Sequence, residues 1–234
     1  MRNLFFSLFL LFTAMTEASL LDNLRRANKG DYIVTAQGKS YTLLHIYDRK
    51  DNILTIEEIT APMRQIQRLK KPWKEWIMQG APNNTAWVMY AVDLNNGKML
   101  AYYSLTKQEM YDLSQADSFL TTLLNLKLQP IPYADRRKTG LPIQSNRPLW
   151  HPQMVVEGRP IPNVEFDAWR TQWPKDNSDL SGKEIEVYIP NENSKYPSYF
   201  PYWLEISGVI GNAKIRIVDS GSGMDSPAAP LKTR

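Results

Sequence analysis

The chain has 234 residues, a formal net charge of +4 at pH 7 and no cysteine. Its length is compatible with one large domain or two small ones, and it is sufficient to bury a substantial core without disulfide bonds. The lack of cysteine excludes a disulfide-stapled secreted domain and a bacterial lipoprotein, whose acylated residue would be a cysteine. The charge is too small for this length to indicate nucleic acid as a partner.

The first 18 residues have the pattern of a secretory signal peptide. A short basic leader at residues 1–3 precedes an apolar run at residues 4–14, and small residues before and at Ala18 fit a cleavage site. An N-terminal membrane anchor is the alternative, but the run is shorter than the roughly 20 residues that a bilayer core requires. With no cysteine in the chain, this pattern predicts export to a bacterial periplasm.

A helix, a three-stranded meander and a basic helix are predicted before residue 75. Leucines at helical spacing that end at Lys29-Gly30 indicate the first helix, and alternating apolar residues between turn-forming residues indicate the strands. Pro72 is expected to end or kink the basic helix. The helices are expected at residues 20–28 and 63–74, and the strands at residues 32–36, 41–47 and 53–59.

The clearest hairpin joins strands expected at residues 86–94 and 99–105, because an Asn-Gly pair at Asn96 separates two apolar runs. The first of these strands has no polar face, which predicts a place near the centre of the sheet. A capping box from Thr106 to Glu109 predicts the start of a helix, and leucines at helical spacing predict another helix at residues 116–128.

The second half of the chain is predicted to be mostly strands. Residues 133–162 form a proline-rich irregular insertion with a short strand inside it, and the small, polar residues after Gly221 indicate disorder. The last three strands have the alternation of an antiparallel meander. Strands are expected at residues 154–156, 164–173, 184–189, 199–207 and 213–219.

The expected organisation is a signal peptide at residues 1–18, a single domain at residues 19–221 and a disordered tail at residues 222–234. Eight or nine strands, besides the short one at residues 154–156, are arranged in antiparallel hairpins with two or three helices between them, which indicates an α+β fold.

The sequence shows no catalytic motif and no metal-ligand spacing. Asp219-Ser220-Gly221 resembles the active-site turn of aspartic proteases, but the single copy and short continuation favour an ordinary strand end. His45 and His151 could pair with carboxylates in acid–base chemistry, although a core imidazole is more common in an apolar strand. We therefore predict no enzymatic activity, no cofactor and no metal. A hydrolase with a dispersed site is kept as an alternative.

Basic residues beside tryptophans mark a candidate interaction surface. Such a surface suits an anionic membrane or an acidic partner, and a solvated helix face is the plainer interpretation. Residues 136–138 are a weaker example of the same pattern. The residues expected to form the interaction surface are Arg64, Arg68, Lys70, Lys71 and Trp73.

The aromatic and methionine content is high, with 7 tryptophans, 12 tyrosines and 9 methionines. These side chains fill cores by default, but they also line pockets for apolar ligands. Two predicted strands lack a polar face, and a sheet curved around a cavity would need an apolar inner surface and a covered outer one. This pattern favours the interpretation that the apolar side chains line a pocket.

The order of elements resembles that of the outer-membrane lipoprotein-sorting carriers, the LolA-like proteins of the bacterial periplasm. The resemblance depends on the initial helix and meander, the strand Thr85-Ala86-Trp87-Val88-Met89-Tyr90, the leucine-rich helix and the closing meander. It implies a strongly curved antiparallel sheet, an unclosed barrel covered by helices, that holds the acyl chains of a lipoprotein or lipid. No position matches the family's functional arginine in context, and the insertion at residues 133–162 departs from the family's pattern.

We therefore expect a non-enzymatic periplasmic protein that binds or carries a lipid or acylated ligand in an apolar concavity. An envelope interaction or scaffold protein without a ligand cavity is the alternative. The expected partners are a lipid or acylated protein, an envelope protein or, transiently, a membrane surface. The side chains expected to line the concavity are Trp87, Met89, Tyr90, Phe119, Leu123 and Trp203.

Overall fold

The computed structural model describes residues 18–137, 153–192, 195–208 and 213–231, without the side chains of residues 114–119 and 213. The predicted signal peptide, apart from Ala18, lies outside the described residues, as does the middle of the proline-rich insertion.

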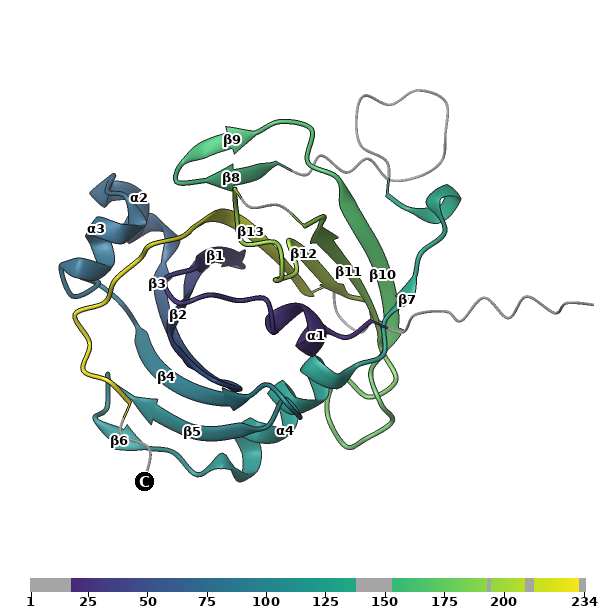
Figure 1. Cartoon of the computed structure of the whole chain (residues 1–234), viewed down its shortest axis with the longest axis horizontal. Coiled ribbons are helices and arrows are strands. Elements are labelled where there is room, and N and C mark those ends of the chain that lie inside the picture. The colour runs from purple at the N-terminus through teal and green to yellow at the C-terminus, as the bar shows by residue number, and fades with distance from the viewer. Residues whose placement is uncertain (1–17, 138–152, 193–194, 209–212, 232–234) are drawn as a thin grey trace, which may run out of the picture.

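One antiparallel sheet of eleven strands dominates the structure, and it curves around the helix α1 (Figure 1). The strand order is β6-β5-β4-β3-β2-β1-β13-β12-β11-β10-β7, and the sheet is not closed, because β6 and β7 lie at its two edges. The strands of this sheet are β1 (Tyr32–Gln37), β2 (Ser40–Lys50), β3 (Ile53–Pro62), β4 (Ala86–Asp93), β5 (Met99–Ser104), β6 (Glu109–Met110), β7 (Gln129–Pro130), β10 (Phe166–Gln172), β11 (Glu184–Pro190), β12 (Trp203–Ile206) and β13 (Ala213–Gly221).

Two helices lie on the concave side of the sheet. In α1 (Leu20–Leu24), the Ser19 side chain accepts a hydrogen bond from the backbone N–H of Asp22 and so caps the helix, whose three leucines are buried. The second helix, α4 (Leu113–Asn125), packs beside α1, and leucines of both helices belong to the core of the concave side.

The outer face is covered by two short helices and a hairpin. The helices are α2 (Met63–Leu69) and α3 (Trp73–Met78), separated by Lys70 in a left-handed conformation and by Pro72. The hairpin of β8 (Met154–Val156) and β9 (Arg159–Ile161) forms a separate two-stranded sheet against β13 (Figure 1). A short 3₁₀ turn, η1 (Tyr133–Asp135), follows β7.

The strand register decides which side chains face inward. Leu44 of β2 lies opposite Glu58 of β3, and the next pair along the same strands is His45 with Glu57. Because successive side chains of a strand point to opposite faces, Leu44 and Glu58 face the concave side, while His45 and Glu57 face outward.

Most of the predicted elements are confirmed. The first meander, the hairpin β4–β5 and the closing meander β11–β12–β13 all form with antiparallel register. The described residues contain four α-helices rather than two or three. They also contain thirteen strands, and the unexpected ones are only two or three residues long.

Two local predictions are wrong. The expected capping box does not start a helix, because the Thr106 hydroxyl accepts a hydrogen bond from the backbone N–H of Trp87, and Glu109 pairs with β5 as part of β6. β4 also lies third from a sheet edge rather than near the centre. Its outward face is apolar because α2 and α3 cover part of it, and this does not require a central position in the sheet.

The prediction of a disordered tail is wrong for residues 222–231. This segment runs along the outer face of the sheet (yellow in Figure 1). Met224 is buried, its backbone N–H bonds to Gly30 and its carbonyl oxygen lies 3.0 Å from Nε2 of His45. The carbonyl oxygen of Ala228 accepts a hydrogen bond from the Tyr47 hydroxyl. Polar composition indicated disorder, but the folded sheet offers partners for these backbone groups.

Candidate functional site

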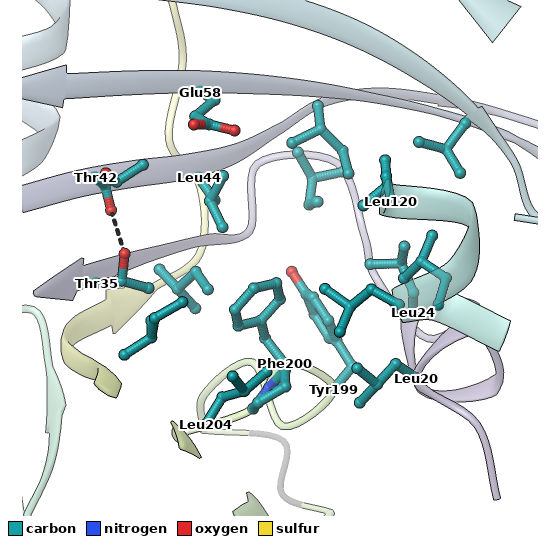
Figure 2. A pocket seen from close by; sticks show the side chains of 18 of the residues that line it. Leu20, Leu24, Thr35, Thr42, Leu44, Glu58, Leu120, Tyr199, Phe200 and Leu204 are labelled. Carbon is teal, nitrogen blue, oxygen red and sulfur yellow. Dashed lines mark hydrogen bonds between the residues drawn. The ribbon is translucent and has the colours of Figure 1, made fainter. Parts of the chain in front are cut away.

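A cavity of about 280 Å³ lies on the concave face, between the sheet and the helices α1 and α4 (Figure 2). Its wall is mainly apolar. The apolar and aromatic lining residues are Leu20, Leu24, Ile33, Leu44, Ile46, Ile56, Tyr90, Val92, Leu120, Leu123, Leu124, Tyr199, Phe200, Pro201, Leu204 and Ile215.

Three parts of the chain bring this lining together. The central strands contribute alternate side chains, α1 and α4 contribute leucines, and the segment before β12 contributes Tyr199, Phe200 and Pro201. Figure 2 shows the rings of Tyr199 and Phe200 between the sheet and the leucines of α1. Residues from both ends of the chain therefore meet at one site.

The polar residues of the lining are Thr35, Gln37, Thr42 and Glu58. The Thr35 hydroxyl donates a 3.3 Å hydrogen bond to the carbonyl oxygen of Thr42, and the hydroxyl oxygens of Thr42 and Thr60 lie 3.1 Å apart. The lining contains no lysine, arginine or histidine among the described residues. Glu58 carries the one carboxyl group of these described lining residues.

Glu58 has a sparse polar environment. The Tyr90 hydroxyl donates to its Oε2 over 3.4 Å, which is long for a hydrogen bond between oxygens. Burial raises the pKa of Glu58, because the apolar surroundings disfavour its charged form, and the contact with Tyr90 opposes this effect. Burial also raises the pKa of Tyr90, and the nearby Glu58 carboxylate adds to that shift.

The residues expected to line the concavity divide between the two faces. Tyr90 and Leu123 lie on the cavity wall, while the Phe119 side chain lies outside the described residues. Trp87 and Met89 are not in the wall, because they alternate with Tyr90 along β4 and so face outward. Trp203 alternates in the same way with the wall residue Leu204 of β12.

Several wall residues were not expected from the sequence. Tyr199 and Phe200 occur in a segment predicted as a strand, and Leu20 and Leu24 belong to the first helix. The sequence did contain a sign that Glu58 could face the cavity, because two successive glutamates interrupt a mainly apolar strand. One of two successive strand residues must face the covered concave side.

A buried histidine–glutamate pair lies on the opposite face. Nδ1 of His45 is 2.8 Å from Oε2 of Glu57, and Nε2 of His45 donates to the carbonyl oxygen of Met224. Oε1 of Glu57 accepts hydrogen bonds from Nε1 of Trp87 at 2.8 Å and from the Ser226 hydroxyl at 2.7 Å. Protein groups occupy the polar atoms of both side chains beneath the C-terminal segment, so this pair anchors that segment to the sheet.

Asp219 and His151 are the other two residues that the sequence offered for catalysis. Asp219 belongs to β13, and its Oδ1 accepts backbone hydrogen bonds from Gly158 and Ser220, of which the bond from Gly158 attaches the β8–β9 hairpin to β13. Burial raises the pKa of Asp219. His151 lies outside the described residues. Among the described residues, no group of three or more histidine, aspartate or glutamate side chains could hold a metal ion.

The expected interaction surface lies on α2, α3 and the turn between them. Arg64, Arg68 and Lys70 are exposed, whereas Lys71 contacts Glu75 and Gln79. Trp73 is half-buried and packs edge-on against Tyr41 and Trp76. The basic side chains therefore gather on one outer surface beside a packed tryptophan.

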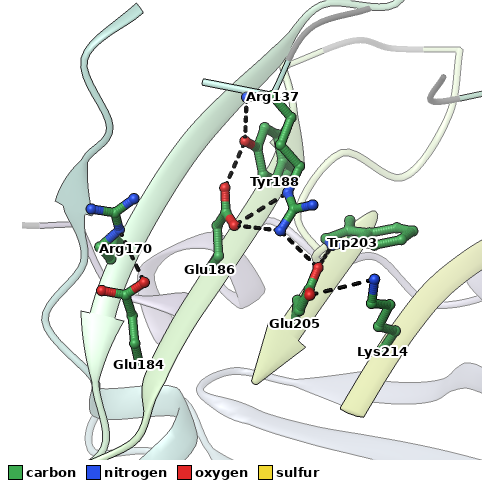
Figure 3. Close-up of polar contacts among 8 residues, drawn as sticks. All are labelled: Arg137, Arg170, Glu184, Glu186, Tyr188, Trp203, Glu205 and Lys214. Carbon is green, nitrogen blue, oxygen red and sulfur yellow. Dashed lines mark hydrogen bonds and ion pairs between the residues drawn. The ribbon is translucent and has the colours of Figure 1, made fainter. Parts of the chain in front are cut away.

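Arg137 does not belong to a free basic surface. Its guanidinium contacts the carboxylates of Glu186 and Glu205 at 2.7 and 2.8 Å, and the Tyr188 hydroxyl accepts its backbone N–H (Figure 3). Lys214 lies 3.4 Å from Glu205. The cluster attaches the segment after η1 to the outer face of β11 and β12. The prediction of an exposed basic patch is wrong for this residue.

Within the part of the chain that the structure describes, no helix has the length and apolar character needed to span a membrane.

Comparisons with known proteins give a family and a fold. The structure of the hypothetical protein CT021 from Chlamydia trachomatis is similar, with 21% identity, a TM-score of 0.67, and coverage of 93% of this chain and all of that one. At this identity the likeness shows the fold alone. None of the curated proteins that were compared matches the chain. The family model described as CT021 protein matches residues 42–162, more than half of the sequence, and the chain therefore belongs to the CT021 protein family.

Proposed function

We propose that this protein binds a single-chain lipid, or the acyl chain of a larger molecule, in the concave cavity, without acting as an enzyme. The cavity itself carries the proposal, because its volume is about 280 Å³ and most of its wall is aliphatic or aromatic. An apolar cavity of about 150 Å³ accommodates benzene, so a chain on the order of ten carbon atoms matches this site.

The arrangement of elements supports the same proposal. The sheet acts as an unclosed barrel, with α1 and α4 over its concave side, so that a chain between them would contact mainly apolar groups. The resemblance to lipoprotein-sorting carriers implies the same use of such a sheet. Export to the periplasm, where such a carrier would meet lipids and acylated proteins, stays a prediction.

Filling the cavity tests this function. The substitution Leu123→Trp adds volume to the cavity wall, whereas Leu100→Trp adds the same side chain at an exposed position of β5. We expect 1-dodecanol to bind the unchanged protein and L100W in isothermal titration calorimetry and native mass spectrometry. The affinity of L123W for 1-dodecanol should fall at least tenfold, because the tryptophan side chain would fill part of the volume that the alkyl chain occupies.

The opposite result would contradict the proposal. If 1-dodecanol binds none of the folded proteins, or binds L123W as tightly as L100W, the cavity is not a site for an alkyl chain. Circular dichroism of both variants serves as the control for folding.

A second function, contact with an anionic membrane or acidic partner, is favoured by the exposure of Arg64, Arg68 and Lys70. Each basic residue near an anionic bilayer contributes about 1 kcal/mol, so reversal of all three charges should weaken vesicle binding at least 100-fold. Co-sedimentation with phosphatidylglycerol vesicles measures this. A control variant reverses the charges of exposed Lys50, Lys98 and Arg159. Equal losses in both variants would indicate net charge rather than this surface.

A further inference from the structure

The cavity is polar at one end and apolar at the other. Along β2, the inward side chains change from Thr42 to Leu44 to Ile46. Thr42 lies opposite Thr35 of β1, whereas Ile46 lies opposite Ile56 of β3. The leucines of α1 and α4 surround the apolar side, while Figure 2 shows Thr35, Thr42 and Glu58 away from them. A ligand with distinct ends would therefore have one orientation.

The polar end of the cavity contains the carboxyl group of Glu58, which receives little hydrogen bonding from the protein itself. The long contact from the Tyr90 hydroxyl is the one hydrogen bond that reaches Glu58 from the described residues, and it involves Oε2. Glu58 is half-buried and lines the cavity, so a ligand there can reach its carboxylate, and both oxygens of an ionised carboxylate accept hydrogen bonds. Partial burial against the apolar wall raises the pKa of Glu58. By contrast, the neighbouring Glu57 has three side-chain partners.

The charge of the lining decides which head groups fit. A carboxylate or phosphate head group would meet Glu58 and find no basic side chain among the described lining residues. A head group that donates hydrogen bonds would instead give Glu58 a stronger partner than the distant Tyr90 hydroxyl, because hydrogen bonds to charged groups are stronger than those between neutral groups. The threonine hydroxyls and Gln37 can accept further hydrogen bonds from it.

We propose that the cavity selects single-chain amphiphiles whose head group donates hydrogen bonds, an ammonium or hydroxyl group, over fatty-acid anions, and that Glu58 receives this head group. This inference rests on the proposed function, since it names the class of ligand for the same cavity. The alkyl chain lies among the leucines of α1 and α4, and the head group lies between Thr42 and Glu58.

The test compares three ligands with the same chain and different head groups. Dodecylamine, 1-dodecanol and dodecanoate are titrated into the full chain by isothermal titration calorimetry, near neutral pH and below their aggregation concentrations. We expect dodecylamine to bind at least tenfold more tightly than dodecanoate, with 1-dodecanol between them.

The variant Glu58→Gln removes the charge and keeps the shape. It should reduce the preference for dodecylamine over dodecanoate by about tenfold, the value of one charge-assisted hydrogen bond. The matched control Glu75→Gln removes a carboxylate from the exposed side of α3 and should leave the preference unchanged.

The outcomes separate the two proposals. If dodecanoate binds as tightly as dodecylamine, or if E58Q keeps the full preference, the role of Glu58 is overturned while the lipid-binding function stands. If none of the three ligands binds the full chain, the proposed function falls, and this inference falls with it.

Discussion

Glu57 and Glu58 show how much one position along a strand changes the role of a residue. Glu57 faces outward and is held by His45, Trp87 and Ser226. Glu58 faces the cavity and receives one long hydrogen bond. The two side chains are identical, and the alternation of the strand alone separates an anchoring carboxylate from a candidate ligand-binding one.

Glu58 should make the stability of the protein depend on pH. Its folded pKa is raised, so its contribution is fully present below the unfolded pKa and is lost as pH rises through the folded pKa. The uncharged variant Glu58→Gln escapes this loss. We therefore expect its free energy of unfolding, relative to the unchanged protein, to increase between about pH 4 and about pH 8.

Urea denaturation at both pH values measures this difference. The exposed substitution Glu75→Gln is the control and should show no comparable change with pH. A difference between E58Q and the unchanged protein that stays constant across this range would contradict the prediction.

At the scale of elements, side chains from distant segments secure the covering pieces. Arg137 holds the segment after η1 against β11 and β12, and the C-terminal segment closes over His45 and Glu57 (Figure 3 shows the first cluster). Both attachments use carboxylates on the outer face of the sheet. The covering pieces therefore depend on polar contacts as well as on apolar packing.

Removal of Arg137 should be much more costly than removal of a similar surface arginine. Arg137→Ala leaves Glu205, which is almost fully buried, without its closest cation, and we expect a loss of about 1–3 kcal/mol in the free energy of unfolding. Arg170→Ala breaks the exposed ion pair with Glu184 and should cost less than about 1 kcal/mol. Chemical denaturation of both variants measures the difference, and equal losses would show that the cluster contributes little.

Truncation after Gly221 tests the role of the C-terminal segment. The deletion uncovers the site of Met224 and removes partners of His45 and Glu57. Burial of a methionine side chain contributes about 1.5–3 kcal/mol, and each lost buried hydrogen bond adds about 1–3 kcal/mol. We expect a clear decrease in Tm by differential scanning calorimetry.

A milder deletion provides the control for this truncation. Removal of residues 232–234 leaves every described contact of the segment in place and should not change the Tm. A full truncation that unfolds at the same temperature as this control would show that residues 222–231 do not stabilise the sheet.

At the scale of the whole molecule, the sheet joins the two ends of the chain. β1 pairs with β13, so the first and last strands of the large sheet lie side by side near its middle. The cavity wall likewise combines β1–β4, both concave helices and the segment before β12. A ligand in this cavity would contact parts of the chain that are far apart in sequence.

Such a ligand should stabilise the whole fold. At 100 times its Kd, 1-dodecanol would add about 2.7 kcal/mol, which for a protein of this size corresponds to an increase in Tm of roughly 5–10 °C. Differential scanning calorimetry measures the shift. L123W should show a much smaller one, and an equal shift in both proteins would place the binding elsewhere.

The sequence by itself determined most strands and their local pairing. Alternation located β1, β2, β3 and β13, and the Asn-Gly pair at Asn96 located the turn between β4 and β5. These features depend on residues that are neighbours in the chain, so local rules are sufficient. The same rules failed at Thr106, where a hydroxyl bonds to a strand that is distant in sequence.

Only the tertiary structure decided which face of the sheet forms the cavity and what covers each side. Both faces of β4 are apolar, so the pattern could not assign Tyr90 to the wall and Met89 to the outer face. The pairing of β1 with β13 and the docking of Met224 join residues that are far apart in the chain. Such contacts depend on how the complete sheet curves, and alternation along one strand carries no information about that curvature.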